Sequence, residues 1–213
     1  MTEGWACKPV FDKNIVFNQA NDYNSYINPQ GVVLLTGGGR ITMDLKAKLR
    51  HVPNFPKEGI DFIDITTVLQ DHEALQQSIT EMKKLSEEMG DFDLIIGPES
   101  RGFIFGAPLA YALNKGFVPI RKRGKLPYKT ASIEYELEYG KDVLEIHEDA
   151  IRPGQRVLIV DDLLATGGTM ESNIKLVEKL GGEVAGLVFF IELTFLNGRK
   201  KLHGYKISSI VEF

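Results

Sequence analysis

The residues best suited to chemistry lie in one short segment, VLIVDDLLATGGT, which spans residues 157–169. An apolar run ends in two adjacent carboxylates, Asp161 and Asp162, and a loop of small residues follows. This loop consists of Ala165, Thr166, Gly167, Gly168 and Thr169. Backbone N–H groups in such a loop converge on an anion without obstruction, and the threonine hydroxyls add donors. The segment therefore predicts a binding site for a phosphate monoester.

The two carboxylates beside this loop need partners of their own. Ionised Asp161 and Asp162 only accept hydrogen bonds, and they repel a bound phosphate. The vicinal hydroxyls of a ribose would donate to them, and Mg²⁺ would supply positive charge. The spacing therefore indicates one ligand that carries a ribose with a 5′-phosphate. The alternative is an acidic helix cap with a glycine turn that binds no ligand.

Two other kinds of phosphate loop are excluded by the same segment. A Walker A loop ends in Gly-Lys-Ser/Thr, whereas Gly168 is followed by Thr169 and Met170. A dinucleotide-binding loop needs G-x-G-x-x-G, which does not occur here. The loop is therefore of a third kind.

Basic side chains that suit phosphate oxygens occur in two further segments. Arg101 lies in the loop 97–102, and its planar guanidinium matches the geometry of a phosphate. Residues 121–125, RKRGK, place four cations in five positions. The plain alternatives are a surface arginine near a helix start and a solvated charged turn.

The elements that must position these residues follow from the hydrophobic pattern. A helix capped by Asp71 and ended by Gly90 carries apolar residues at spacings of three and four: Leu75, Ile79, Met82, Leu85 and Met89. Short apolar strands are predicted at 94–96, 117–120, 144–147, 157–160 and 184–191, with helices over 103–113 and 170–180. Strand–helix–strand units in series predict an α/β fold with a mostly parallel central sheet flanked by helices.

Two segments lack this pattern. Residues 124–143 are polar and poor core material, which is typical of a lid over an active site or of an exposed hairpin. Residues 1–42 hold five Asn, five aromatic and only six charged residues with no sustained period. We therefore expect a domain over 43–213 and a poorly patterned extension over 1–42, in which 34–39, LLTGGG, is a flexible linker.

Composition narrows the class of protein. The net charge of −4 argues against a surface that coats DNA or an anionic membrane. The lone Cys7 excludes an internal disulfide, and no His or Cys pair has zinc-ligand spacing. No apolar run is long enough to span a bilayer, and no secretory signal is readable at the N-terminus. We expect a cytoplasmic globular protein without a nucleic-acid or membrane partner.

The segment 157–169 resembles the phosphoribosyl pyrophosphate signature of the type I phosphoribosyltransferases. Four flanking segments, NFPKEGIDFIDIT, IRKRGKLP, LEYG and IELTFLNGR, are similar to the adenine branch of that family. The resemblance covers 43–213. It implies the type I fold with a small hood and a flexible lid loop, and a homodimer. It also implies transfer of the 5-phosphoribosyl group from phosphoribosyl pyrophosphate to adenine, giving AMP and pyrophosphate, with Mg²⁺ as cofactor.

The resemblance also implies a role for particular residues. Those assigned to phosphoribosyl pyrophosphate are Arg101, Arg121, Lys125, Tyr139, Asp161, Asp162 and the loop 165–169. Phe62 and Leu193 would sandwich the adenine, and Glu138 would hydrogen-bond its N7 edge. Backbone groups near 60–63 would read the N6 and N1 edge. Ile63 stands where the family commonly has Arg or Lys, so no side-chain contact is assigned to that position. The residues implied in catalysis are Glu138, Asp161, Asp162 and Arg101, and Mg²⁺ would be held through the substrate with no protein ligand assigned.

Two other functions remain open at this point. A related enzyme could use hypoxanthine, guanine, xanthine or orotate in place of adenine. A non-catalytic regulator could bind phosphoribosyl pyrophosphate and a nucleic acid, but residues 1–42 are short and weakly charged for a DNA-binding domain.

Overall fold

The computed structural model describes residues 24–27, 33–36, 42–137 and 140–213, and the chain divides into two units, Met1–Thr42 and Met43–Phe213. In the first unit β1 (Asn24–Ile27) pairs antiparallel with β2 (Val33–Thr36). The linker prediction is therefore wrong for residues 34–36, because this apolar run forms strand pairs. The glycines that follow lie outside the described residues.

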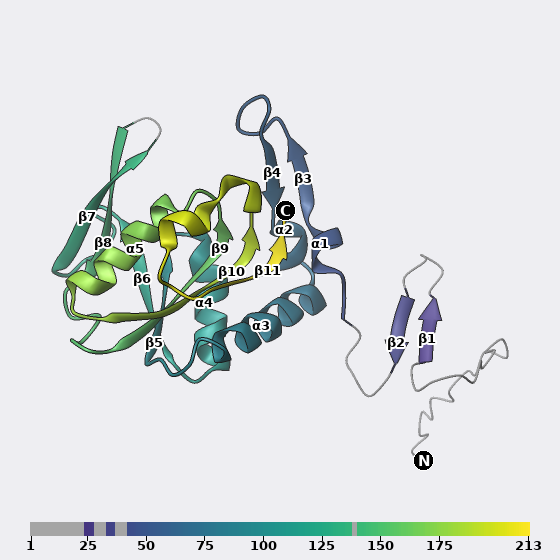
Figure 1. Cartoon of the computed structure of the whole chain (residues 1–213), viewed down its shortest axis with the longest axis horizontal. Coiled ribbons are helices and arrows are strands. Elements are labelled where there is room, and N and C mark those ends of the chain that lie inside the picture. Colours follow the sequence, from purple (N-terminus) through teal and green to yellow (C-terminus); the bar gives the residue numbers. More distant parts are fainter. Residues whose placement is uncertain (1–23, 28–32, 37–41, 138–139) are drawn as a thin grey trace, which may run out of the picture. The chain divides into compact units, whose positions relative to one another are not determined.

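The second unit is built on a seven-stranded sheet (Figure 1). Its strands, in spatial order, are β11 (Ile207–Glu212), β10 (Glu183–Glu192), β9 (Arg156–Leu164), β5 (Leu94–Pro98), β6 (Gly116–Lys122), β8 (Gly140–His147) and β7 (Thr130–Leu137). The first five run parallel, whereas β8 and β7 are antiparallel to their neighbours. The predicted α/β fold with a mostly parallel sheet is confirmed.

Alternation along the central strands gives this sheet two apolar faces. On β9, Leu158 and Val160 join the core that packs with α3 (His72–Glu87) and α4 (Arg101–Ala112). Val157 and Ile159 join the core on the other face, which is covered by α5 (Gly168–Lys179). Burial on both faces explains the continuous apolar run, as is usual for a parallel strand.

The helix α3 begins as predicted, and the predicted apolar residues lie in the core or pack against it. The Asp71 carboxylate accepts hydrogen bonds from the N–H groups of Glu73 and Ala74 at 3.0 and 3.1 Å. The fully buried positions of α3 are Ala74, Ser78, Met82 and Ser86. Each buried serine donates its hydroxyl to the carbonyl four residues earlier at 2.7 Å, so small polar residues are tolerated on the same core-facing side as the predicted apolar ones.

The second unit contains two antiparallel hairpins, one in a separate two-stranded sheet and one at the edge of the seven-stranded sheet. The hood consists of α1 (Leu45–Lys48), the antiparallel pair β3 (Arg50–Pro53) and β4 (Asp61–Asp64), and α2 (Thr66–Leu69). The polar segment expected to be a lid forms the antiparallel hairpin β7–β8 (Figure 1). Its turn, Glu138–Tyr139, lies outside the described residues. Over the described ranges, no helix combines the length and apolar character needed to cross a membrane.

Candidate active site

The site forms where the chain path reverses direction across the sheet. The strand β5 leads through α4 to β6 on one side, and its neighbour β9 leads through α5 to β10 on the other. Ligands of open α/β sheets bind at such a switch point, outside the carboxyl ends of the strands. A cavity of about 360 Å³ lies there, lined by residues 98–101, 161–170 and Tyr135. It unites Arg101, the acidic pair and the loop 165–169, as the sequence predicted.

The loop 165–169 can present backbone donors because of two glycines. Gly167 has a left-handed φ of +81° and precedes the first turn of α5, whose N–H groups are free of helical partners at that end. A β-carbon on Gly167 would lie 2.6 Å from the carbonyl oxygen of Gly198. A β-carbon on Gly198 would in turn collide with the carbonyl oxygen of Ala165. The loop is therefore backed directly by the chain at Gly198.

The acidic pair lies in the carboxyl-terminal half of β9, at the cavity wall. The N–H of Asp162 donates to Asp161 Oδ1 at 2.9 Å, and Arg101 Nε lies 2.9 Å from Asp162 Oδ2. Burial and the neighbouring Asp162 charge raise the pKa of Asp161 well above its ordinary value. Burial also raises the pKa of Asp162, although the charge of Arg101 opposes the rise. Both carboxyls are therefore held where a hydroxyl donor or a cation would favour their ionised form.

Arg101 is placed by the tight turn between β5 and α4. The peptide bond between Glu99 and Ser100 is cis, and Arg101 is the first residue of α4. A β-carbon on Gly102 would lie 2.6 Å from Pro98 Cδ and 3.0 Å from the carbonyl oxygen of Val160. The glycine therefore lets the turn pack against β9, which brings Arg101 to the acidic pair.

The other predicted cations lie outside the cavity wall. Arg121 Nη2 and Nε lie 3.2 and 3.3 Å from the two carboxylate oxygens of Glu99, and this pairing lowers the pKa of Glu99. Arg121 Nη1 also donates to the carbonyl of Lys125 at 3.1 Å. The half-buried Arg121 and the exposed Lys125 thus stand beside the turn at Glu99 but do not line the cavity.

The predicted base-binding residues are spread over separate elements. Phe62 on β4 is half-buried, and its ring lies 5.8 Å from the guanidinium carbon of Arg101. Leu193 follows β10, and its N–H donates to the carbonyl of Leu164 at 2.9 Å. Neither residue lines the cavity, and the side chain of Ile63 is buried in the core. Glu138 and Tyr139 lie outside the described residues.

Tyr135 on β7 lines the cavity and was not among the predicted site residues. Its hydroxyl donates to Asp142 Oδ2 at 3.3 Å, and Lys122 Nζ lies 3.1 Å from the same oxygen. Burial and the Asp142 charge raise the pKa of Tyr135. The alternation of Ile133 and Tyr135 with glutamates could have indicated the inward face of this strand.

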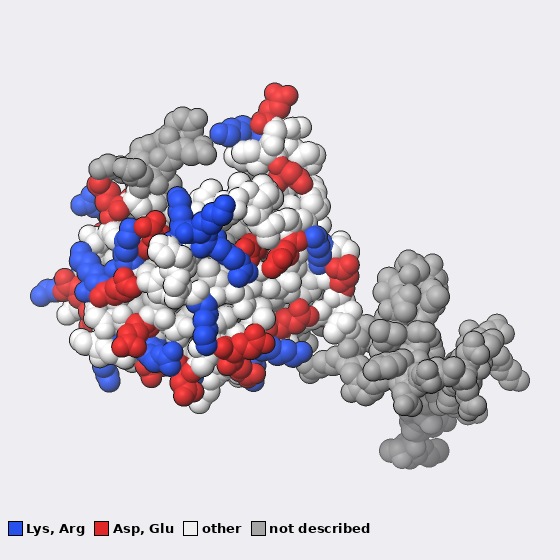
Figure 2. Space-filling model, in the orientation of Figure 1, with Lys and Arg blue, Asp and Glu red and all other residues white. Residues whose placement is uncertain are grey.

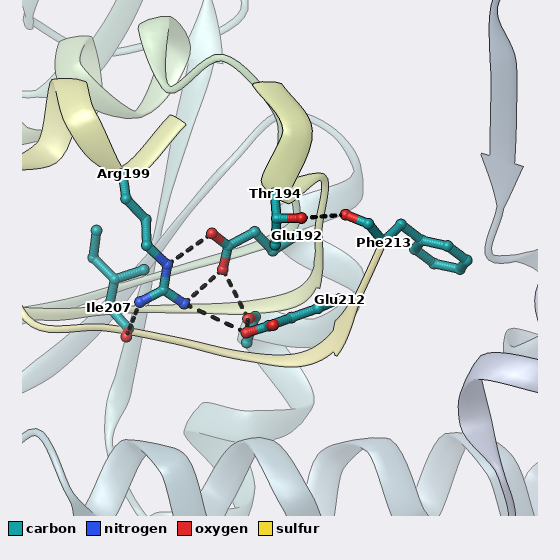
Figure 3. Close-up of polar contacts among 7 residues, drawn as sticks. Glu192, Thr194, Arg199, Ile207, Glu212 and Phe213 are labelled. Carbon is teal, nitrogen blue, oxygen red and sulfur yellow. Dashed lines mark hydrogen bonds and ion pairs between the residues drawn. The ribbon is translucent and has the colours of Figure 1, made fainter. Parts of the chain in front are cut away.

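Sequence reasoning also missed the cluster that anchors the chain behind the loop (Figure 3). Both oxygens of the buried Glu192 carboxylate pair with Arg199, at 2.7 Å to Nε and 2.6 Å to Nη2. Ser209 donates to Glu192 at 2.9 Å, and Arg199 Nη1 donates to the carbonyl of Ile207 at 3.0 Å. The Arg199 hydrogen bond lowers the pKa of Glu192. This cluster ties the ends of β10 and β11 to the turn that carries Gly198.

The fold and the site together define an α/β protein whose cavity at the switch point of the sheet joins a glycine loop, an acidic pair and an arginine. Residues 64–211 match the family model of the phosphoribosyl transferase domain. The chain belongs to this family, in its adenine phosphoribosyltransferase branch.

Named relatives support this placement. The chain is 75% identical to adenine phosphoribosyltransferase of Acetivibrio thermocellus over 171 residues, which are 80% of this chain and 100% of the relative. The crystal structure of adenine phosphoribosyltransferase from Thermoanaerobacter pseudethanolicus is 59% identical, with a TM-score of 0.75 over 80% of this chain and 98% of that one. The Saccharomyces cerevisiae enzyme, crystallised with adenine and an imino-altritol 1,6-bisphosphate, is 44% identical, with a TM-score of 0.75 over 78% and 96%.

Proposed function

We propose that the protein transfers the 5-phosphoribosyl group of phosphoribosyl pyrophosphate to N9 of adenine, giving AMP and pyrophosphate. The observation that carries the proposal is the single cavity that holds the glycine loop, the acidic pair and Arg101. Phosphoribosyl pyrophosphate carries three groups that match them: its 5′-phosphate fits the glycine loop, its ribose diol fits the acidic pair, and its leaving pyrophosphate fits Arg101. The names of the relatives supply the base.

The loop 165–169 binds the 5′-phosphate in this proposal. The backbone N–H groups at the start of α5 and the hydroxyls of Thr166 and Thr169 are its donors. Asp161 and Asp162 accept hydrogen bonds from the two ribose hydroxyls. Each new hydrogen bond favours the ionised carboxylates, so ligand binding relieves the cost that raises their pKa in the free protein.

The reaction forms a bond from N9 to C1′ as the bond from C1′ to pyrophosphate breaks, and the proton that adenine loses passes to water. Positive charge develops on the sugar ring, as in other glycosyl displacements. The field of Asp161 and Asp162 stabilises this charge, and Arg101 stabilises the departing pyrophosphate. For this, the Arg101 side chain must exchange its contact with Asp162 for one with the pyrophosphate.

The remaining assignments complete the site. Arg121 and Lys125 face the pyrophosphate, Phe62 and Leu193 sandwich the adenine, and backbone groups near 60–63 read its edge. Glu138 hydrogen-bonds N7, and Tyr139 closes the site over the substrates. Phe62 supports this arrangement because it already lies beside Arg101.

Mg²⁺ fits this set of residues. Burial disfavours the ionised form of Asp161 and Asp162, and a bound cation would favour it. Carboxylate oxygens are the hard ligands that Mg²⁺ prefers. The described residues contain no cluster of three or more potential metal ligands, so substrate and water oxygens would complete the coordination. When bound, Mg²⁺ neutralises charge on the leaving pyrophosphate.

We extend the proposal to the organisation of the chain. The catalytic domain comprises 43–213, which is as long as the aligned Acetivibrio thermocellus enzyme, and 1–42 is dispensable for the reaction. The protein acts as a cytoplasmic homodimer. Activity and oligomeric state of a variant that starts at Met43 test these assignments, and loss of folding or turnover would overturn the boundary.

A base panel tests the proposed function. Adenine, hypoxanthine, guanine, xanthine and orotate are each supplied with phosphoribosyl pyrophosphate and Mg²⁺, and pyrophosphate release is followed. Release with adenine alone is expected. Preference for another base would overturn the substrate, and tight binding of phosphoribosyl pyrophosphate without release from any base would favour a regulator.

A further inference from the structure

The phosphate loop has no positively charged side chain of its own to balance the charge of a bound phosphate. Residues 157–170 contain no lysine or arginine, in contrast to a Walker A loop. A bound phosphate monoester carries close to two negative charges at neutral pH. The carboxylates of Asp161 and Asp162 stand in the same cavity and repel it. Arg101 in that cavity is paired with Asp162 and is assigned to the pyrophosphate, so the backbone N–H groups and the two threonine hydroxyls of the loop would have to outweigh this repulsion.

A cation from another part of the chain stands beside the loop. Lys201 belongs to the short helix η2 (Gly198–Leu202). A β-carbon built on Gly168, the first residue of α5, would lie 3.9 Å from Lys201 Nζ. The exposed Lys201 forms no hydrogen bond or ion pair with any residue that the structure describes. The pKa of Glu171, lowered mainly by a hydrogen bond from Lys175, is lowered further by the charge of Lys201.

The backbone position of Lys201 is fixed by its neighbours in η2. Gly198 packs against the carbonyl of Ala165, and Leu202 is buried at 1% exposure. Arg199 is held by the Glu192 carboxylate (Figure 3). Both ends of η2 are therefore anchored, and the ammonium at position 201 is left next to the loop. Figure 2 shows lysine and arginine side chains gathered over the short yellow helical turns of Figure 1.

Lys201 does not line the cavity of the free protein, but it stands beside the loop that does. We propose that Lys201 is a ligand of the 5′-phosphate, supplied to the loop 165–169 by η2. The inference rests on the proposed function, because it names a further residue of the same site. It explains the close contact of Gly198 with the loop, since that contact brings the Lys201 ammonium to Gly168. It predicts that Lys201 contributes to binding only when the ligand carries a phosphate.

Binding of AMP and of adenosine to the full chain tests this by calorimetry. We expect Lys201→Gln to raise the Kd for AMP about tenfold and to leave the Kd for adenosine unchanged. Lys201→Arg should recover most of the AMP affinity because it keeps the charge. The matched control is Lys200→Gln, which removes the same charge one residue away, and its AMP affinity should stay within about twofold of the wild type.

The outcomes separate the inference from the proposed function. If the wild type binds AMP well above adenosine and Lys201→Gln binds AMP equally well, Lys201 is not a phosphate ligand. An equal loss of AMP and adenosine affinity would also overturn the inference, because it would indicate a structural role. A wild type that binds AMP no better than adenosine would overturn the proposed function itself. The salt dependence of AMP binding gives a second readout, and it should weaken in Lys201→Gln.

Discussion

The phosphate end and the base end of the proposed site are built in different ways. At the phosphate end, one continuous segment runs from the buried strand β9 through the loop 165–169 into α5 and lines a single cavity. At the base end, the assigned residues come from the hood, from the chain after β10 and from the hairpin turn. Phe62 and Leu193 lie outside that cavity wall. The phosphate end is therefore preformed, whereas the base end requires several elements to come together around the ligand.

The difference predicts which substitutions separate affinity from turnover. A change at the preformed end should act on phosphoribosyl pyrophosphate whatever the base is. A change at the base end should act on adenine and leave the sugar phosphate bound. Substitutions at the two ends test this separation.

The largest effect is expected from the acidic pair. The double substitution Asp161→Asn with Asp162→Asn should lower kcat at least about a hundredfold, because it removes the field at the sugar ring. Adenine affinity should change little. Steady-state kinetics with both substrates measure this, and unchanged turnover would contradict the assigned role.

The same pair should limit stability at neutral pH. The folded-state pKa of Asp161 lies above its ordinary value of 3.8, so the folded protein holds this proton more tightly than the unfolded chain. The free energy of unfolding therefore falls as pH rises from about 3.8 through the raised pKa, and it stays low above that range. Asp161→Asn should raise Tm at pH 7 by about 2–4 °C, and a lower Tm would contradict this account.

A second large effect is expected from the loop backbone. Gly167→Ala places a β-carbon 2.6 Å from the Gly198 carbonyl oxygen at a left-handed φ. We expect KM for phosphoribosyl pyrophosphate to rise more than about tenfold, because the loop donors lose their alignment. Gly154→Ala is the control, since Gly154 has a φ of +80° with nothing within 4 Å. It should cost about 1–2 kcal/mol of stability and leave KM unchanged.

At the base end, Glu138→Gln should lower kcat/KM for adenine about tenfold, because one charge-assisted hydrogen bond to the base is weakened. KM for phosphoribosyl pyrophosphate should stay within about twofold. The exposed Glu148, which follows β8, provides the control Glu148→Gln. If Glu138→Gln raised KM for both substrates equally, the two ends would not be separable.

The smallest effect is expected at Arg121, because its guanidinium is already paired with the Glu99 carboxylate. Arg121→Gln should raise KM for phosphoribosyl pyrophosphate about threefold. Glu99→Gln should lower that KM or leave it unchanged, because it releases Arg121 toward the substrate. A rise in KM for both variants would mean that Arg121 acts by holding the turn at Glu99 and not by touching pyrophosphate.

The contrast between the two ends also explains what the sequence could predict. The strand β9, the loop and α5 follow from contiguous residues, so apolar runs and glycines predicted them. The Glu99–Arg121 pairing, Tyr135 in the cavity wall and Gly198 behind the loop depend on contacts between distant segments. Serines 78 and 86 show a different limit, because they are polar residues on the core-facing side of α3 whose hydroxyls are satisfied by local helical hydrogen bonds.

The account depends most on where the sugar phosphate binds, and a crystal structure of the protein with AMP measures this directly. We expect the phosphate oxygens within hydrogen-bond distance of the N–H groups of residues 167–169, and the ribose hydroxyls on the carboxylates of Asp161 and Asp162. A phosphate bound at residues 121–125, or a ribose turned away from the acidic pair, would contradict it.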